Sequence, residues 1–130
     1  ELQACIGIEQ MKKLHGRANR KKEIFDQYKN ELSELKSITL FEHDLHYTSP
    51  WFIDCMCERR DELMNFLKKQ GIGSRVMYPP INKQKIYFTE KFYPVSDSVG
   101  AQGLWLPSAV QLTNEQVSRV TREIKNFYTK

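Results

Sequence analysis

Apolar side chains recur at three- and four-residue intervals from residue 2 to about residue 35, and this spacing predicts one long α-helix. Gly16, near the middle of this span, is the expected point of a bend. The first two turns, LQACIGI, are apolar almost all round, so they need cover that this chain alone is not expected to supply. The apolar stripe consists of Ile8, Met11, Leu14 and Ala18, followed by Ile24, Tyr28, Leu32 and Leu35.

Segments rich in β-branched and aromatic residues predict β-strands at residues 38–41, ITLF, and at residues 51–57, WFIDCMC. Because side chains alternate between the two faces of a strand, Asp54 is expected on the face opposite the larger apolar set. Two further short strands are predicted at residues 76–78, VMY, and at residues 103–106, GLWL. The apolar face of the second strand consists of Trp51, Ile53, Cys55 and Cys57.

Two shorter helices have clear boundary signals. Residues 60–70, RDELMNFLKKQ, carry acids early and lysines late, and Gly71 ends this helix. The last helix follows Thr113, which forms a capping box with Gln116. The inward positions are Leu63, Phe66 and Leu67 in the first helix and Val117, Val120, Ile124 and Phe127 in the last.

The order of these elements is a long helix, two strands, a helix, a strand, a loop-rich stretch, a strand and a helix. This order predicts an α+β fold, in which the long N-terminal helix and the further helices pack on a small sheet. A chain of 130 residues is long enough for one domain with a core of its own. The chain does not begin with methionine and shows no secretory signal, so a piece of a longer or processed protein is expected.

Composition favours a water-soluble domain over a membrane or nucleic-acid-binding protein. No apolar run approaches the roughly 20 residues needed to span a bilayer. The 20 basic and 16 acidic residues give a net charge of +4, and basic residues mostly alternate with acids along helical faces. This pattern is typical of solvated helix surface rather than of a nucleic-acid footprint.

Three cysteines, Cys5, Cys55 and Cys57, make an odd number. Cys55 and Cys57 are neighbours on one face of a predicted strand, which is a poor arrangement for a disulfide. No CxxC motif is present, so reduced, buried thiols in a cytoplasmic protein are expected.

Residues 42–46, EHDLH, combine two histidines with two acids, but their spacing and the lack of a third ligand favour a polar turn over a metal site. The chain contains no GxSxG, HExxH, P-loop or GxGxxG motif. The sequence therefore shows no catalytic apparatus that this chain could operate alone, and no metal is expected.

Residues 71–87, GIGSRVMYPPINKQKIY, allow two interpretations. One is a strand followed by a proline-stiffened surface loop, with Arg75 solvated. The other is a preorganised binding edge, because adjacent prolines lower the entropy of holding a loop in one shape. In that case the guanidinium of Arg75 suits phosphate or carboxylate, while Tyr78 and Asn82 add directional hydrogen bonds. A sugar nucleotide is a ligand of this kind.

Four stretches in order, ELQACIGIEQMKKL, RANRKKEIFDQY, ERRDELMNFLKKQGIGSRVMYPPIN and GLWLPSAVQLTNEQ, resemble the C-terminal part of the DegT/DnrJ-type aminotransferases. The resemblance covers essentially all of the chain. It implies that residues 1–130 form the C-terminal small domain of the fold type I pyridoxal phosphate (PLP) aminotransferase fold. It also implies a homodimeric enzyme that transfers an amino group from glutamate to a nucleotide-linked 4-keto-6-deoxy sugar. The lysine that carries PLP would lie in a large domain before Glu1, so this chain alone is expected to be inactive.

Within this family, the run SRVMYPPIN is most similar to members that make perosamine from GDP-linked keto sugars, and Arg75 matches the arginine of that subgroup. Many relatives carry histidine where Met77 and Asn82 stand. The resemblance therefore implies a substrate edge formed by Arg75, Tyr78 and Asn82, where the amide of Asn82 can still bind a hydroxyl and Met77 can only pack. The alternative from another class is a noncatalytic nucleotide- or RNA-binding module, although no pair of aromatic RNA-binding strands is recognisable.

Overall fold

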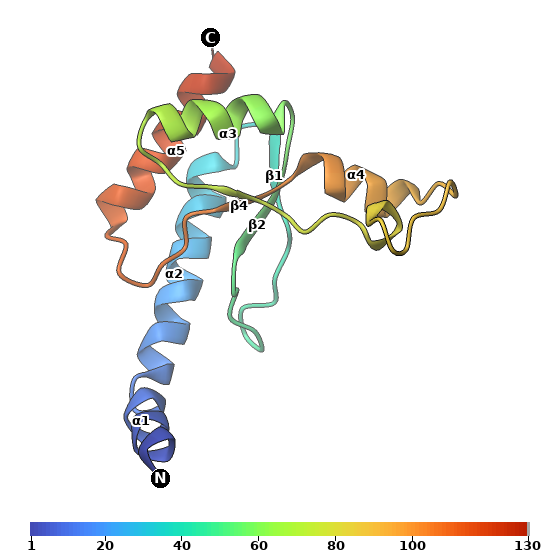
Figure 1. Cartoon of the computed structure of the whole chain (residues 1–130). Coiled ribbons are helices and arrows are strands. Elements are labelled where there is room, and N and C mark those ends of the chain that lie inside the picture. The colour runs from blue at the N-terminus through green and yellow to red at the C-terminus, as the bar shows by residue number, and fades with distance from the viewer. Residues whose placement is uncertain (130) are drawn as a thin grey trace.

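The computed structural model describes residues 1–129 and contains a four-stranded antiparallel sheet with strand order β1-β2-β4-β3. Helices α2, α3 and α5 pack on one face of this sheet, while α1 extends from the bottom of the molecule and α4 from its right-hand side (Figure 1). The predicted α+β fold with helices on a small sheet is confirmed. The elements are α1 (Leu2–Met11), α2 (Leu14–Leu32), β1 (Ile38–Leu40), β2 (Ile53–Cys57), α3 (Arg60–Lys69), β3 (Arg75–Val76), the 3-10 helix η1 (Ile81–Lys83), α4 (Pro94–Gln102), β4 (Gly103–Leu106) and α5 (Asn114–Thr129).

The core lies between the inner face of the sheet and the three helices. Strand β2 alternates between buried and half-buried residues, as the sequence pattern predicts, and its inner face meets α2 and α5. The hydroxyl of Tyr28, fully buried in α2, donates to the carbonyl oxygen of Pro107 at 3.0 Å, so its polar end is satisfied. Buried residues at the centre of this core are Ile24, Phe25, Tyr28, Leu32, Ile53, Cys55, Cys57, Leu63, Leu67, Leu104, Leu106, Val117, Val120 and Ile124.

The last helix starts as its sequence predicts. The backbone N–H of Thr113 donates to the Gln116 side chain at 2.9 Å, and the backbone N–H of Gln116 donates to the Thr113 hydroxyl at 3.3 Å. This reciprocal pair is the predicted capping box, which satisfies N–H groups that the first helical turn leaves unpaired.

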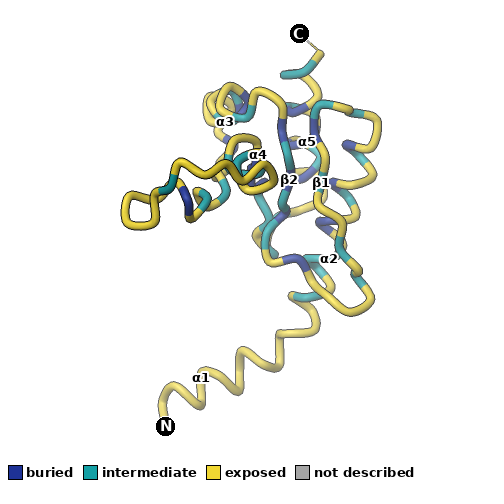
Figure 2. Tube along the Cα trace, turned by 90° about the vertical axis from the view of Figure 1, so that its right-hand side faces the viewer, coloured by how far each residue is buried: buried dark blue, intermediate teal, exposed yellow. Residues whose placement is uncertain are grey.

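The prediction of a single long N-terminal helix is wrong, because the segment forms two helices, α1 and α2. The break lies at Lys12 and Lys13, where the N–H of Lys13 donates to Gln10 three residues back, while Gly16 stays helical inside α2. Helix α1 buries none of its residues and extends away from the body of the domain (Figure 2). The expectation that this chain does not cover its apolar first turns is therefore confirmed.

The stretch predicted as loop-rich contains two helices. Residues 77–102, called the arm below, leave the sheet after β3, form η1 and α4, and return into β4 (Figure 1). Helix α4 was missed because its sequence, PVSDSVGAQ, has no apolar stripe, and none of its residues is buried. Pro94 at its first turn and Asp97, whose side chain accepts from the N–H of Tyr93 at 3.2 Å, stabilise its start.

Three smaller predictions also need correction. Strand β2 begins at Ile53, and Trp51 before it is 79% exposed rather than on the buried face. Strand β3 consists of Arg75 and Val76 only. It begins one residue earlier than predicted, and it ends at Val76 because the arm turns away from the sheet there. The cysteines are free and two of them are buried, but Cys5 is exposed because α1 has no cover.

Candidate functional site

A row of three side chains crosses the sheet on the face opposite the helices. The strand register pairs Trp105 of β4 with Asp54 of β2 on one side and with Arg75 of β3 on the other. Neighbours along a strand point to opposite faces of the sheet, and the adjacent residues Cys55 and Leu104 point into the core. The three residues of the row therefore lie on the other face, away from the core.

Trp105 is the fixed centre of this row. It is 6% exposed, and its indole Nε1 donates to Oδ1 of Asp54 at 2.5 Å. The ring of Phe52 stacks on the indole with 4.1 Å between the ring centroids and 12° between the planes. The hydrogen bond and the stacking together define the orientation of the indole.

Arg75 and Tyr78 gather around the same indole. The guanidinium carbon of Arg75 lies 5.6 Å from the centroid of the Trp105 ring and 5.7 Å from that of Tyr78, within the range of cation–π attraction. The Tyr78 ring meets the indole edge-on, with centroids 4.9 Å apart. Arg75 is exposed and forms no ion pair with any carboxylate of residues 1–129, so its donors face solvent. An anionic group can therefore reach it.

Asn82 lies elsewhere, inside the arm. It is 8% exposed, its side-chain amide donates to Oδ1 of Asp97 at 3.2 Å, and its backbone carbonyl oxygen accepts from the backbone N–H of Thr89 at 3.3 Å. Desolvation raises the pKa of Asp97, but bonds from Asn82, the Tyr93 N–H and Lys83 outweigh it and lower this pKa. The arm is thus organised around this carboxylate.

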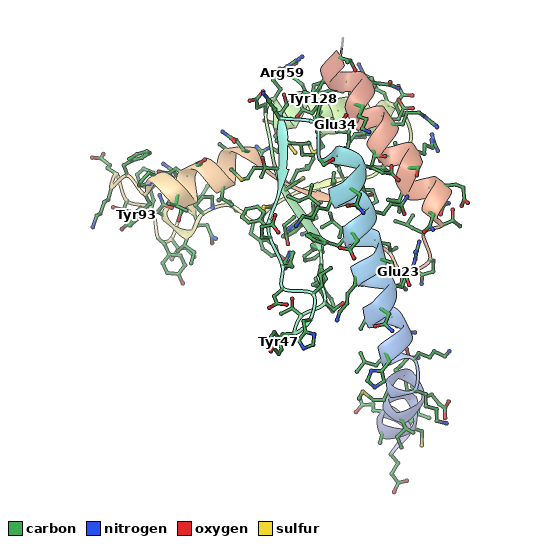
Figure 3. All side chains as sticks on the ribbon, turned by 180° about the vertical axis from the view of Figure 1, so that it is seen from behind. Glu23, Glu34, Tyr47, Arg59, Tyr93 and Tyr128 are labelled. Carbon is green, nitrogen blue, oxygen red and sulfur yellow. The ribbon has the colours of Figure 1, made fainter. Side chains whose placement is uncertain are left out.

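Asn82 also lines a shallow hollow of about 260 Å³ in the arm. Phenol, hydroxyl and amide groups in this hollow suit a hydroxyl-bearing ligand. Tyr93, at one wall, lies far out on the arm and well away from Tyr47 at the tip of the β1–β2 loop (Figure 3). The lining residues are Ile81, Asn82, Tyr87, Thr89, Tyr93 and Ser96.

Met77 joins the arm to the sheet. Its N–H donates to the carbonyl oxygen of Gly103 at 3.2 Å, and its side chain lies where a Cβ at Gly103 would be. The structure therefore brings Arg75, Tyr78 and Met77 to one edge of the sheet, and holds Asn82 by contacts within the arm.

The polar turn predicted at residues 42–46 is present, with the carbonyl oxygen of Asp44 accepting from the N–H groups of Tyr47 and Thr48. His43 points inward from it, with Nε2 at 3.7 Å from Oδ2 of Asp54 and without a hydrogen-bond partner. Across residues 1–129, no three His, Cys, Asp or Glu side chains are grouped to hold a metal ion.

The surroundings of Lys21 differ from the solvated helical surface that the sequence predicts for most basic residues. Partial burial lowers its pKa, and its ammonium donates to the carbonyl oxygen of Trp51 at 2.8 Å and to the hydroxyl of Ser108 at 3.1 Å. These two acceptors tie α2 to the ends of β2 and β4.

Sequence reasoning missed Trp105, Asp54 and Phe52 as parts of this site. The alternation along residues 51–57 placed Asp54 correctly on the face away from the core. Nothing in the sequence indicated that β4 lies between β2 and β3, so the contact of Trp105 with both charged residues could not be foreseen.

Within residues 1–129, none of the helices combines the length and the apolar character that crossing a membrane requires.

Comparison with known proteins gives concordant matches in sequence and structure. The model of the DegT/DnrJ/EryC1/StrS aminotransferase family matches residues 1–125. A GDP-perosamine synthase of Escherichia coli O157:H7 is 31% identical over 97% of this chain and 35% of its own length. A GDP-perosamine synthase of Vibrio cholerae is 30% identical over 96% of this chain and 36% of its own length.

Among solved structures, S. venezuelae DesV in complex with a ketimine intermediate matches with a TM-score of 0.86 at 26% identity, over 98% of this chain and 36% of its own. The aminotransferase TlmJ from Streptoalloteichus hindustanus matches with a TM-score of 0.87 at 23% identity, over 95% of this chain and 35% of its own. The chain thus spans about a third of the length of the proteins it matches.

Proposed function

The chain belongs to the DegT/DnrJ/EryC1/StrS aminotransferase family, and we propose that it is the small C-terminal domain of a sugar aminotransferase. The observation that carries this proposal is the match of nearly the whole chain to about a third of each relative, in sequence and in fold. A large domain outside residues 1–130 would then complete the enzyme.

We propose that the substrate is a GDP-linked 4-keto-6-deoxy sugar and that glutamate is the amino donor, which gives a perosamine-like product. Two relatives that cover almost the whole chain are named GDP-perosamine synthase, which supports a nucleotide-linked sugar. The exposed guanidinium of Arg75, without a carboxylate partner among the described residues, supports a diphosphate ligand.

PLP would supply the electron sink for amino transfer in the complete enzyme. That the lysine carrying PLP lies outside this chain, and that the chain alone is inactive, are predictions from the family resemblance. That the intact enzyme is a homodimer and cytoplasmic stays a prediction from the family resemblance.

In this proposal each of the four predicted site residues has its own role. Arg75 donates two parallel hydrogen bonds to the diphosphate, and Tyr78 limits the movement of its guanidinium. Met77 packs at the base of the arm, and Asn82 presents its amide oxygen to a sugar hydroxyl in the hollow of the arm.

The sheet face opposite the helices, which carries Trp105, gives little support to the RNA-binding alternative. Its central aromatic residue, Trp105, is 6% exposed and already stacked on Phe52, so it offers no free surface to a base.

The test is an assay of the full-length protein, loaded with PLP and glutamate, against a panel of 4-keto sugar nucleotides that differ in base and sugar. We expect amination of the GDP-linked keto sugar in preference to the dTDP-linked one. Turnover of amino acids and keto acids without any sugar nucleotide would contradict the proposed function.

A further inference from the structure

The row Asp54–Trp105–Arg75 places opposite charges on the two sides of one buried indole. Asp54 accepts the indole N–H at 2.5 Å, and the guanidinium of Arg75 lies 5.6 Å from the ring centroid. The charged groups do not pair with each other directly, because the indole lies between them in the strand register.

The carboxylate of Asp54 is the polar partner of a nearly buried N–H. The Asp54 side chain is 22% exposed, and among residues 1–129 it forms no ion pair with lysine or arginine. Without it, the N–H of Trp105, a residue that is only 6% exposed, would lose its acceptor, and the stacking on Phe52 would be left to orient the indole.

Arg75 depends on this indole for its own position. Its strand, β3, has only two residues, and the arm departs immediately after it. The ring faces of Trp105 and Tyr78 are therefore the surfaces that restrict the long Arg75 side chain. A carboxylate that accepts the indole N–H also draws electron density into the ring, which strengthens the attraction for a cation on its face.

We propose that Asp54 is a positioning residue, which through the indole of Trp105 holds Arg75 in the orientation that binds the anionic diphosphate of the substrate. The identity of the substrate in this inference rests on the proposed function. The coupling between Asp54 and Arg75 does not depend on it. Asp54 does not touch the ligand. Its removal weakens ligand binding and leaves the turnover number largely unchanged.

The first experiment measures KM and kcat of the full-length enzyme for the sugar nucleotide with three variants. Asp54→Ala is expected to raise KM about three- to tenfold with kcat within about twofold of wild type. Asp54→Asn retains an oxygen that accepts the indole N–H, so it restores most of the loss. Met56→Ala is the matched control, because Met56 lies on the same strand and face and pairs with Gly103 rather than Trp105. Its KM is expected to stay at the wild-type value.

The second experiment does not depend on activity. Binding of inorganic pyrophosphate and of GDP to the full-length protein is measured by calorimetry for wild type, Asp54→Asn, Asp54→Ala, Arg75→Ala and the double variant Asp54→Ala/Arg75→Ala. We expect Asp54→Ala to weaken binding in the wild-type background and to have no further effect once Arg75 is absent.

The outcomes separate the two proposals. Coupling of Asp54 to Arg75 in an enzyme that aminates no sugar nucleotide supports this inference and contradicts the proposed function. An equal effect of Asp54→Ala with and without Arg75, or an unchanged affinity, overturns the inference even in an active enzyme. Absence of binding of either probe to wild type also overturns it, because Arg75 then presents no anion site. Should Asp54→Ala fail to fold, Asp54→Leu, which also lacks an acceptor for the indole N–H, takes its place. A loss of affinity that disappears in the Arg75→Ala background supports the inference, and an unchanged affinity or a loss that persists there overturns it.

Discussion

Arg75 and Asn82 can both hydrogen-bond to a ligand, but their surroundings give them different roles. The guanidinium of Arg75 lies on two aromatic rings and faces solvent. The side-chain amide of Asn82 already donates a hydrogen bond to Asp97 inside the arm. Substitution of Asn82 is therefore expected to loosen the arm as well as to remove a ligand contact, whereas substitution of Arg75 affects the ligand alone.

Arg75→Ala in the full-length enzyme is expected to weaken the sugar-nucleotide half-reaction by roughly tenfold to a hundredfold, since it removes a charge-assisted contact. Arg75→Lys should recover little, because an ammonium cannot reproduce the planar fork. Paired single-turnover titrations, one with glutamate and one with the keto sugar nucleotide, measure the effect. An unchanged second titration in a stably folded variant would show that Arg75 has a structural role only.

Glu31 connects α2 to α5 and makes stability depend on pH. Desolvation raises the pKa of this carboxyl, but hydrogen bonds from Thr121, Gln27 and Ser118 outweigh it, so the pKa lies below its ordinary value of 4.5. A lowered carboxyl pKa stabilises the fold at pH values above 4.5, and this contribution is lost as the pH falls through the folded-state pKa.

We therefore expect Glu31→Gln to lower the free energy of unfolding by about 1 kcal/mol at neutral pH, and by progressively less below pH 4.5. Urea unfolding at a series of pH values tests this, with Glu34→Gln as control, since Glu34 is exposed just beyond the same helix. A Glu31→Gln deficit that is equally large at pH 3 would rule out the carboxylate as its cause.

At the scale of elements, the arm is attached to the sheet through close backbone packing. A Cβ at Gly103 would overlap Sδ of Met77 and would lie 2.5 Å from the carbonyl oxygen of Val99. A Cβ at Gly100 would lie 2.5 Å from Cγ of Pro80. The glycines at the end of α4 thus allow the two ends of the arm to cross closely.

Gly103→Ala is expected to destabilise the chain by about 1–3 kcal/mol, because the carbonyl of Val99 belongs to the backbone and cannot rotate away. Gly73→Ala is the matched control, since a Cβ added at Gly73 would meet no other atom within 4 Å. The melting temperatures of both variants, compared with that of wild type, measure this loss of stability. A Gly103→Ala variant as stable as Gly73→Ala would mean that the arm is not packed as described.

Helix α1 is the element that the rest of the described chain leaves uncovered. It buries no residue, although its composition is mainly apolar (Figure 2). Its position apart from the core explains why its pattern predicted a helix correctly while predicting nothing about what it packs against. Its exposed apolar side chains are Leu2, Ile6, Ile8 and Met11.

At the scale of the whole molecule, the 130-residue chain on its own is expected to self-associate through α1, because exposed apolar surface of this kind favours burial against another surface. Sedimentation velocity over a range of concentrations measures this. The double substitution Ile6→Lys and Ile8→Lys should return the chain to a monomer, whereas Ile86→Lys in the arm should not. A wild-type chain that stays monomeric at high concentration would contradict the expectation.

The sequence by itself determined those features that depend on near neighbours in the chain. Helical spacing located α3 and α5, the Thr113–Gln116 pair located the start of α5, and alternation placed Asp54 on the outer face of β2. The resemblance of four stretches to one family was also present in the sequence, and the family match over residues 1–125 confirms it.

Only the tertiary structure decided the order of the strands, the helix in the arm and the cluster around Trp105. Helix α4 has no apolar stripe because it packs on no core, so its sequence carried no periodic signal. Asp54, Trp105 and Arg75 meet because β4 pairs with both β2 and β3, and this pairing depends on how the sheet packs beneath the helices. Such long-range register is selected by burial of the whole inner face, a quantity that no short stretch of sequence contains.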